Sequence, residues 1–236
     1  MRDTWRMKKI PTALAWSGGK DSAMALAALR ADPTCDVVAL VTTMTRDYDR
    51  ISIHGVRRNV LEAQVAEIGI PLIEMSIPAA ASNVIYEDAF GAALAGLRAA
   101  HAGLERLAFG DLFLTDVRAY RERLLGALGW QPLFPLWGSD TRALAADFIR
   151  RGFRAIVTCV DTTQIDGDFA GREFDAVFLQ DLPACADPCG ENGEFHTCVY
   201  AGPIFSRPLT LHSGERVLRE ARFRYCDVLL GDAPSR

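Results

Sequence analysis

Short apolar runs alternate with longer segments of helical period through the first two thirds of the chain. The apolar runs, each bounded by turn-forming or charged residues, predict strands at residues 12–16, 37–44, 72–77, 107–110 and 155–160. The segments between them are rich in helix formers and predict helices at residues 22–30, 56–68, 81–100, 116–128 and 141–151. Strands and helices that alternate in this order form βαβ units, so we expect an α/β fold with a Rossmann-like parallel sheet.

The pattern changes after Gly129. Residues 129–138 include Trp130, Pro132, Pro135 and Trp137, which are incompatible with a regular helix. Beyond Phe174 the chain is richer in glycine and strand-like: Asn192-Gly193 is typical of a type I′ hairpin, and residues 221–230 partly alternate. We therefore predict an α/β domain at residues 1–129 and a smaller α+β C-terminal domain at residues 130–236.

Composition narrows the functional classes. The 236 residues carry a net charge of −4, which disfavours a nucleic-acid partner. Six cysteines are too sparse for a disulfide scaffold and predict a reducing, cytoplasmic compartment. No secretory signal and no run of 18 apolar residues are present, so we expect no membrane association.

A glycine turn follows the first predicted strand directly and leads into the first predicted helix. Its sequence is Ser17-Gly18-Gly19-Lys20-Asp21-Ser22. Two glycines let backbone N–H groups face one point, and the helix N-terminus adds further unpaired donors, so the turn predicts an anion-binding loop. It is neither a Walker A loop nor a GxGxxG fingerprint. The alternative is a simple chain reversal in which Asp21 or Ser22 caps the helix.

This hexapeptide resembles the SGGxDS loop of the PP-loop ATP pyrophosphatases, which include GMP synthetase and asparagine synthetase. The resemblance implies that ATP is cleaved between its α and β phosphates to AMP and pyrophosphate. Ser17, Gly18, Gly19 and Ser22 would then bind pyrophosphate, Lys20 would supply charge, and Asp21 would hold Mg²⁺ or brace the loop. The resemblance also implies that Thr42 and Thr43, after the second strand, line the adenine pocket.

Two further motifs narrow the family. Phe109-Gly110-Asp111 ends a predicted strand and is followed by DVRAYRERLL, and CGENGEFHT occupies residues 189–197. Together with the glycine turn and His54-Gly55, these motifs resemble the diphthine–ammonia ligase family from about residue 12 to residue 205. The resemblance implies an AMP-forming amide ligase that adenylates a carboxylate and transfers ammonia to it, using ATP and Mg²⁺. It also implies diphthine on translation elongation factor two as substrate, and hence a protein partner.

Asp111 and Gly110 lie at the carboxyl end of a predicted parallel strand, where open α/β sheets bind ligands. We expect Gly110 to contact ATP, and Asp111 to act in catalysis and, with Asp21, in magnesium binding. The alternative for Asp111 is a cap on the next turn or helix. Among the arginines of the following helix we choose Arg118 to reach phosphate or substrate, although such residues also pair with Glu122 or Asp116 on a solvated face.

Two carboxylates, Glu191 and Glu194, flank the turn at Asn192-Gly193. We expect them at the rim of a pocket, where they would attract ammonium or a quaternary ammonium group and take a proton from incoming ammonium. The alternative is a hairpin turn with exposed charges. With Asp21 and Asp111 they complete the predicted catalytic set, and Asn192 and Gly193 are predicted to contact substrate.

Two histidines, His54 and His196, are predicted substrate-binding residues, although a packed or solvated histidine is an equal alternative for His54. His196 could also join Cys185, Cys189 and Cys198 at zinc, but the spacing lacks a CxxC pair and we do not adopt that interpretation.

Several alternatives stay open at the level of function. The chain could amidate another small carboxylate, thiolate a tRNA base, or sense ATP without turnover. The sequence decides neither the acyl substrate nor the source of nitrogen, and a homodimer is one possible assembly.

Overall fold

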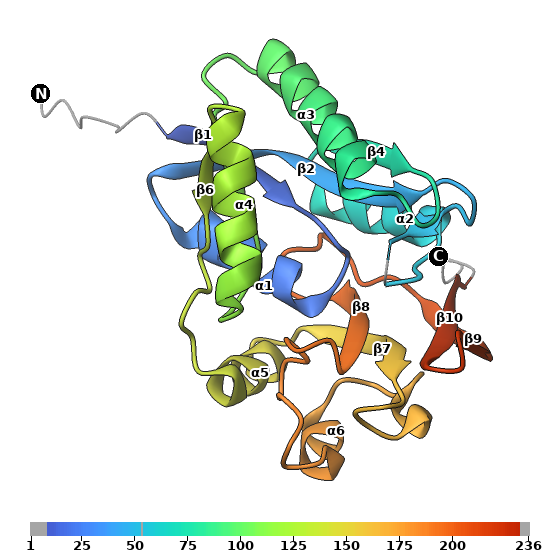
Figure 1. Ribbon diagram of the computed structural model, residues 1–236. Helices are drawn as coiled ribbons and strands as arrows, with labels where there is room; N and C mark the ends of the chain where they lie inside the picture. Colours follow the sequence, from blue (N-terminus) through green and yellow to red (C-terminus); the bar gives the residue numbers. More distant parts are fainter. Residues whose placement is uncertain (1–8, 53, 232–236) are drawn as a thin grey trace, which may run out of the picture.

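The computed structural model describes residues 9–52 and 54–231 and contains two β-sheets with helices around them (Figure 1). The first sheet consists of β1 (Ile10–Ala15), β2 (Cys35–Thr45), β3 (Arg50–Ile51), β4 (Leu72–Ile77), β5 (Arg106–Ala108) and β6 (Gln131–Leu133). Its order is β3-β2-β1-β5-β6, with β4 also paired to β2. Every pair is parallel except β2 with β3, so the predicted parallel sheet is confirmed.

Helices cover both faces of this sheet. Successive strand residues point to opposite sides, so the apolar strands need helices on each face. Leu14 joins a core with α1 (Lys20–Ala31) and α2 (Arg58–Ile68), whereas its neighbour Ala13 joins a second core. That second core includes residues of α3 (Asn83–Ala100) and α4 (Thr115–Ala127). The five predicted helices are all present, with ends shifted by up to two residues.

The second sheet is antiparallel and lies on the side of α1 and α2. Its order is β8-β7-β10-β9, from β7 (Arg154–Asp161), β8 (Phe195–Ala201), β9 (Leu211–Arg219) and β10 (Phe223–Leu230). Around it are the α-helices α5 (Thr141–Arg150) and α6 (Ala176–Asp181) and the short 3₁₀ helix η1 (Gly167–Phe169). The core on the α1 side continues without interruption into this sheet, so the two sheets share one apolar interior.

Two expectations about the second half were wrong. The strand predicted at residues 155–160 exists as β7, but it lies between β8 and β10 in the antiparallel sheet and not in the parallel one. A short apolar run shows that a strand is buried on both faces and does not identify its sheet. The segment after Phe174 also forms the helix α6, whose first turn is capped by Asp175: the Phe178 N–H donates to its carboxylate at 2.8 Å.

The predicted type I′ hairpin at Asn192-Gly193 is also wrong. Gly193 has a φ of +85°, but Asn192 is not among the residues with positive φ, and the segment before it is turn and not strand. Two consecutive residues with positive φ, the feature that a type I′ turn requires, occur instead at Glu220 and Ala221, both with φ of +51°, between β9 and β10. Pairing of β9 with β10 therefore imposes on Glu220 and Ala221 a left-handed backbone conformation that residues other than glycine do not favour.

The chain passes from one sheet to the other after β6. This strand includes Pro132 and pairs with β5, so the parallel sheet continues beyond Gly129 to Leu133. Asp140 then caps α5 by accepting a hydrogen bond from the Ala143 N–H at 2.7 Å. Within residues 9–52 and 54–231, no helix combines the length and apolar character needed to cross a bilayer.

Candidate active site

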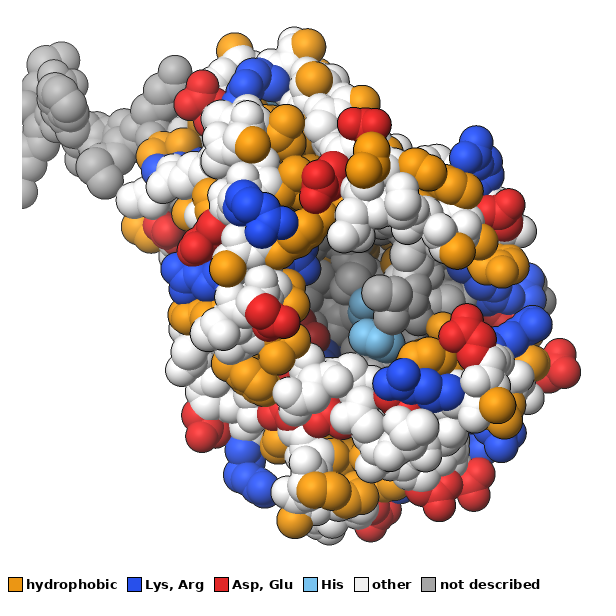
Figure 2. Space-filling view, in the orientation of Figure 1, with side chains coloured by type: hydrophobic (Ala, Val, Ile, Leu, Met, Phe, Trp, Pro, Cys, Tyr) orange, Lys and Arg blue, Asp and Glu red, His pale blue; other side chains and the backbone are white. Residues whose placement is uncertain are grey.

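A cavity of about 980 Å³ opens at the carboxyl ends of the parallel strands, between them and the second sheet. Figure 2 shows the opening as a hollow with histidine side chains visible inside it. Its wall includes Ser17 after β1, Thr42 and Thr43 in β2, and Gly110 and Asp111 after β5. It also includes residues just before and at the start of β8, namely Gly190, Glu191, Gly193, Phe195, His196 and Thr197. The fold thus brings the predicted motifs to one cavity.

The glycine turn is held in place by hydrogen bonds on the side that faces away from the cavity. Gly18 has a φ of +74°, and its carbonyl oxygen accepts hydrogen bonds from the Val199 N–H at 2.8 Å and the Gln64 amide at 3.0 Å. The C=O and N–H of one planar peptide unit point in opposite directions, so the Gly19 N–H faces away from those partners. It lies 3.3 Å from Ser17 Oγ, a side chain that lines the cavity.

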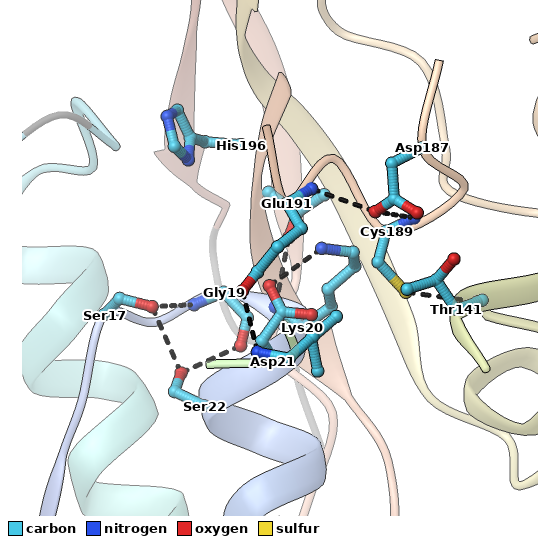
Figure 3. A network of polar contacts seen from close by, with 12 residues as sticks. Ser17, Gly19, Lys20, Asp21, Ser22, Thr141, Asp187, Cys189, Glu191 and His196 are labelled. Carbon is cyan, nitrogen blue, oxygen red and sulfur yellow. Dashed lines mark hydrogen bonds and ion pairs between the residues drawn. The ribbon is translucent and has the colours of Figure 1, made fainter. Parts of the chain in front are cut away.

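Helix α1 begins at Lys20, two residues before its predicted start. Gly19 is the N-cap residue, and no side chain of the turn caps the helix there. The alternative in which Asp21 or Ser22 caps the helix is therefore wrong. Ser22 Oγ instead donates to the Gly19 carbonyl at 2.9 Å, and Ser17 Oγ lies 3.3 Å from Ser22 Oγ (Figure 3). The arrangement leaves a helix N-terminus with its positive dipole end directed at the cavity.

Lys20 lines the cavity at the start of α1, with only 4% of its surface exposed. Its Nζ is 2.8 Å from Asp21 Oδ2 and 5.4 Å from the centre of the Phe195 ring. Burial opposes its charge, but Asp21 raises the pKa of Lys20 above its ordinary value, so the lysine stays protonated. Its backbone N–H donates to Thr197 Oγ1 at 3.0 Å, which ties the first turn of α1 to β8.

Asp111 pairs with Arg121 and does not cap α4, whose N-cap is Leu114. The Arg121 Nε lies 2.6 Å from Asp111 Oδ2, and both residues line the cavity. A glycine is needed at position 110 because the segment after β5 approaches the backbone of α1 closely: a Cβ there would lie 2.8 Å from the Asp21 carbonyl carbon. The strand end and the start of α1 are therefore in contact.

The structure places Arg118 away from the predicted phosphate site. Its guanidinium pairs with Glu122 at 2.7 Å and lies over the rings of Phe134 and Trp137, and it does not line the cavity. Arg121, one helical turn further along α4, lines the cavity instead.

Glu191 reaches from the segment before β8 to the end of β5. Its Oε1 accepts a hydrogen bond from the Leu112 N–H at 2.7 Å (Figure 3 shows the residue beside Asp21). Burial, together with the nearby charges of Asp21 and Asp111, raises the pKa of Glu191 to about 7. A carboxyl group with that pKa exchanges protons readily near neutral pH.

Glu194 and Asn192 have a different placement from the expected pocket rim. Glu194 is only 2% exposed, and its Oε1 accepts hydrogen bonds from the Asp187 N–H at 2.8 Å and the Asn192 amide at 3.0 Å. Neither residue lines the cavity, although Gly193 does. Glu194 thus organises the turn that presents Glu191.

Thr42, Thr43, His54 and His196 all line the cavity. Thr42 Oγ1 is buried and has no hydrogen-bond partner among residues 9–52 and 54–231, which suits a polar ligand group at this position. The His54 and His196 ring centroids are 4.7 Å apart. In the part of the chain that the structure describes, no group of three or more His, Cys, Asp or Glu residues could hold a metal ion, and all six cysteines are free thiols.

Sequence reasoning missed Gln64, which is fully buried in α2. Its Nε2 donates to the carbonyls of Gly18 at 3.0 Å and Val199 at 2.6 Å, and its Oε1 accepts from Trp16 Nε1 at 3.3 Å. A signal was available: position 64 continues the stripe of Val56 and Val60 at a spacing of four, and a polar residue on such a stripe needs buried partners.

Comparison with known proteins gives matches to both halves of the chain. Residues 9–132 match the family model described as the diphthamide synthase N-terminal domain, and residues 140–228 match the diphthamide synthase C-terminal domain. The chain is also similar to a diphthine–ammonia ligase of Schizosaccharomyces pombe, with 30% identity over 121 residues. That alignment covers 50% of this chain and 20% of the relative, so the chain spans about a fifth of the length of that curated protein.

Proposed function

Because the chain belongs to the diphthamide synthase family, we propose that it is an ATP-dependent amide ligase that adenylates a carboxylate and transfers ammonia to it. The proposed carboxylate is that of diphthine, as the name of the Schizosaccharomyces pombe relative suggests. The family resemblance of the motifs implies that this diphthine is carried by translation elongation factor two. The observation that carries the proposal is one cavity lined both by the glycine turn at the start of α1 and by Asp111 and Glu191.

The glycine turn supports the first proposed step, in which the substrate carboxylate attacks the α-phosphorus of ATP. The carboxylate oxygen forms the new bond while the bond to the leaving pyrophosphate breaks. Gly19 N–H, the hydroxyls of Ser17 and Ser22 and the N-terminus of α1 stabilise the negative charge of the departing pyrophosphate. Lys20 adds a positive charge at the start of α1.

The carboxylates of Asp21 and Asp111 fit Mg²⁺, which prefers oxygen ligands and is held by one or two carboxylates together with substrate phosphates. Asp111 Oδ2 is buried and lies 2.6 Å from Arg121 Nε, and among the described residues no donor meets it with hydrogen-bond geometry. Bound Mg²⁺ would neutralise charge on the phosphates.

Glu191 is proposed to accept the proton that ammonium must lose before its nitrogen becomes a nucleophile. Its carboxylate lines the same cavity, and its pKa of about 7 lets it take up and release protons at neutral pH. Ammonia then attacks the acyl carbon and displaces AMP, which leaves an amide. Glu194 supports this step from beneath the turn.

Release of AMP and pyrophosphate tests the proposal when ATP, ammonium chloride and elongation factor two carrying diphthine are supplied together. We expect release to require all three, and Ser17→Ala and Asp21→Ala to lower it by about 100-fold or more. Asp36→Ala, at an exposed position of β2, is the control and should be unaffected.

Other outcomes separate the competing functions. ATP binding without release would show a sensor, release that depends on a small free carboxylate would show a different acyl substrate, and dependence on tRNA and a sulfur donor would show a thiolation enzyme. Full activity of both loop variants would defeat the assignment of the loop.

A further inference from the structure

Two imidazole rings meet in the wall of the cavity beside the glycine turn. His54 follows β3 and His196 lies in β8, and their ring centroids are 4.7 Å apart. A Cβ placed on Gly19 would lie only 3.0 Å from His54 Cε1, so this ring packs directly against the loop. The pair is therefore adjacent to the groups proposed to hold the phosphates of ATP.

Hydrogen bonding determines which nitrogen of His54 carries the proton. Its Nδ1 lies 3.3 Å from the Thr197 carbonyl oxygen, which can only accept. Nδ1 is therefore the protonated nitrogen, and Nε2 keeps a free lone pair. For the ring of His196, no hydrogen bond is found within the described residues. Half-buried acceptor nitrogens without protein partners suit a ligand with N–H or O–H donors.

The surroundings keep both rings uncharged. Burial, supported by the charge of Lys20, lowers the pKa of His54 to about 4. Burial, together with His54 and Lys20, also lowers the pKa of His196 well below its ordinary value. Neutral imidazoles can accept hydrogen bonds, but with a protonated lysine nearby they do not favour the binding of a second cation. The carboxylates of Asp111 and Glu191, at the other wall of the cavity, attract a cation.

We propose that His54 and His196 form the subsite that binds the ammonia nucleophile, with imidazole lone pairs accepting its N–H hydrogen bonds. The inference rests on the proposed amide-ligase function. Held by its hydrogens, ammonia directs its own lone pair away from the rings toward the acyl adenylate. The nitrogen–carbon bond forms, the carbon–oxygen bond to AMP breaks with its electrons going to AMP, and the nitrogen loses one proton to solvent.

Binding is tested first without turnover, by nitrogen-15 NMR of the histidine rings during titration with ammonium chloride. We expect saturable shifts of the His54 and His196 ring signals. Sodium chloride and tetramethylammonium chloride should not produce them, because neither cation has an N–H donor. Equal shifts with tetramethylammonium would show a site for cations, and no shift with ammonium would show no site; either result overturns the inference.

Kinetics then test the role of the pair in the reaction. His54→Leu and His196→Leu should each raise the half-saturating ammonium concentration by about tenfold or more, while pyrophosphate affinity changes by about twofold or less. His212→Leu, in β9 outside the cavity, is the matched control. An unchanged ammonium requirement in both variants overturns the inference. Absence of pyrophosphate release by the wild-type chain defeats the proposed function instead, and the NMR titration still decides the subsite.

Discussion

The buried side chain of Gln64 positions the glycine turn, although it does not itself line the cavity. Its amide donates to the Gly18 carbonyl and thereby orients the peptide unit whose N–H faces the cavity side. Trp16 in turn fixes the orientation of the amide by donating to its oxygen. Gln64 and the backbone together favour glycine at position 18, since a Cβ there would lie 2.7 Å from Gln64 Oε1 and φ is +74°.

Gln64→Met should weaken pyrophosphate binding by about tenfold and destabilise the fold by about 1–3 kcal/mol, because it removes two donors and leaves Trp16 Nε1 unpaired. Calorimetric titration with pyrophosphate and thermal denaturation measure the two effects. Gln131→Met is the matched control, since that side chain accepts an exposed hydrogen bond from Arg106. A lower melting temperature with unchanged pyrophosphate affinity would make the role of Gln64 purely structural.

Glu191 predicts the pH dependence of amide formation. Its raised pKa of about 7 means that the carboxyl group is protonated below that pH and cannot accept a proton from ammonium. At saturating ammonium, the rate should fall about tenfold for each pH unit below 7, and Glu191→Gln should remove this limb together with most of the activity. A limb that persists in Glu191→Gln belongs to another group.

At the scale of elements, one carboxylate joins the second sheet to the first half of the chain. Asp227 in β10 lies 2.8 Å from Arg50 Nη1 in β3 and accepts from Arg57 Nε, just before α2, at 3.0 Å. Burial alone would raise the pKa of Asp227, but the hydrogen bonds from Arg57 and Arg50 outweigh it and lower the pKa to about 2. These contacts hold β10 beside the segment that carries His54.

Asp227→Asn should lower the free energy of unfolding by about 1–2 kcal/mol at neutral pH, because the ion pairs with Arg50 and Arg57 are lost and their hydrogen bonds are weakened. A depressed pKa contributes stability that is complete above the ordinary value of 3.8 and is lost as pH falls toward about 2. The difference between variant and wild type should therefore shrink across that acidic range.

Urea denaturation at several pH values measures this difference. The matched control is Asp49→Asn, which breaks an exposed pair with Arg58 and should cost about 0.5 kcal/mol or less. A constant difference from pH 7 to pH 2 would show that the charge of Asp227 does not stabilise the fold.

At the scale of the whole molecule, the two sheets share one core and one hydrogen-bonded seam. The core that contains Leu26 of α1 also contains Phe195 of β8, and the Val199 N–H of β8 donates to the Gly18 carbonyl at 2.8 Å. Unfolding of the second sheet would expose the apolar side of α1 and release the glycine turn. The cavity is thus built from both parts of the chain.

We expect a single cooperative unfolding transition by calorimetry, with a calorimetric enthalpy about equal to the van't Hoff enthalpy. Pyrophosphate should raise the melting temperature of the whole transition, because its site exists only when both parts are folded. Two resolved transitions, with only one sensitive to pyrophosphate, would show that the parts unfold independently.

Local pattern was enough to determine much of this molecule. The order of β1, β2, β4 and β5 and of the helices α1 to α5 follows from apolar spacing, because burial of one face imposes a period of two or 3.6 residues. The short strands β3 and β6 were not predicted. The glycine turn after β1 and Asp111 after β5 were also readable, and the carboxyl ends of parallel strands lie at one edge of the sheet, so these residues had to meet. Glu191 was predicted from its place beside a turn, and the packing of the second sheet brings it to the same cavity.

Tertiary structure alone decided the rest. Which sheet receives β7, whether Arg118 or Arg121 reaches Asp111, and whether Glu194 faces the cavity depend on packing between segments far apart in sequence, which no local period records. The meeting of His54 with His196 and of Gln64 with Gly18 has the same origin, since residues of β8 approach the turn only when the second sheet packs on α1. Sequence therefore determined which chemical groups are present and near which strand ends, and long-range packing determined which of them face the cavity and which support it.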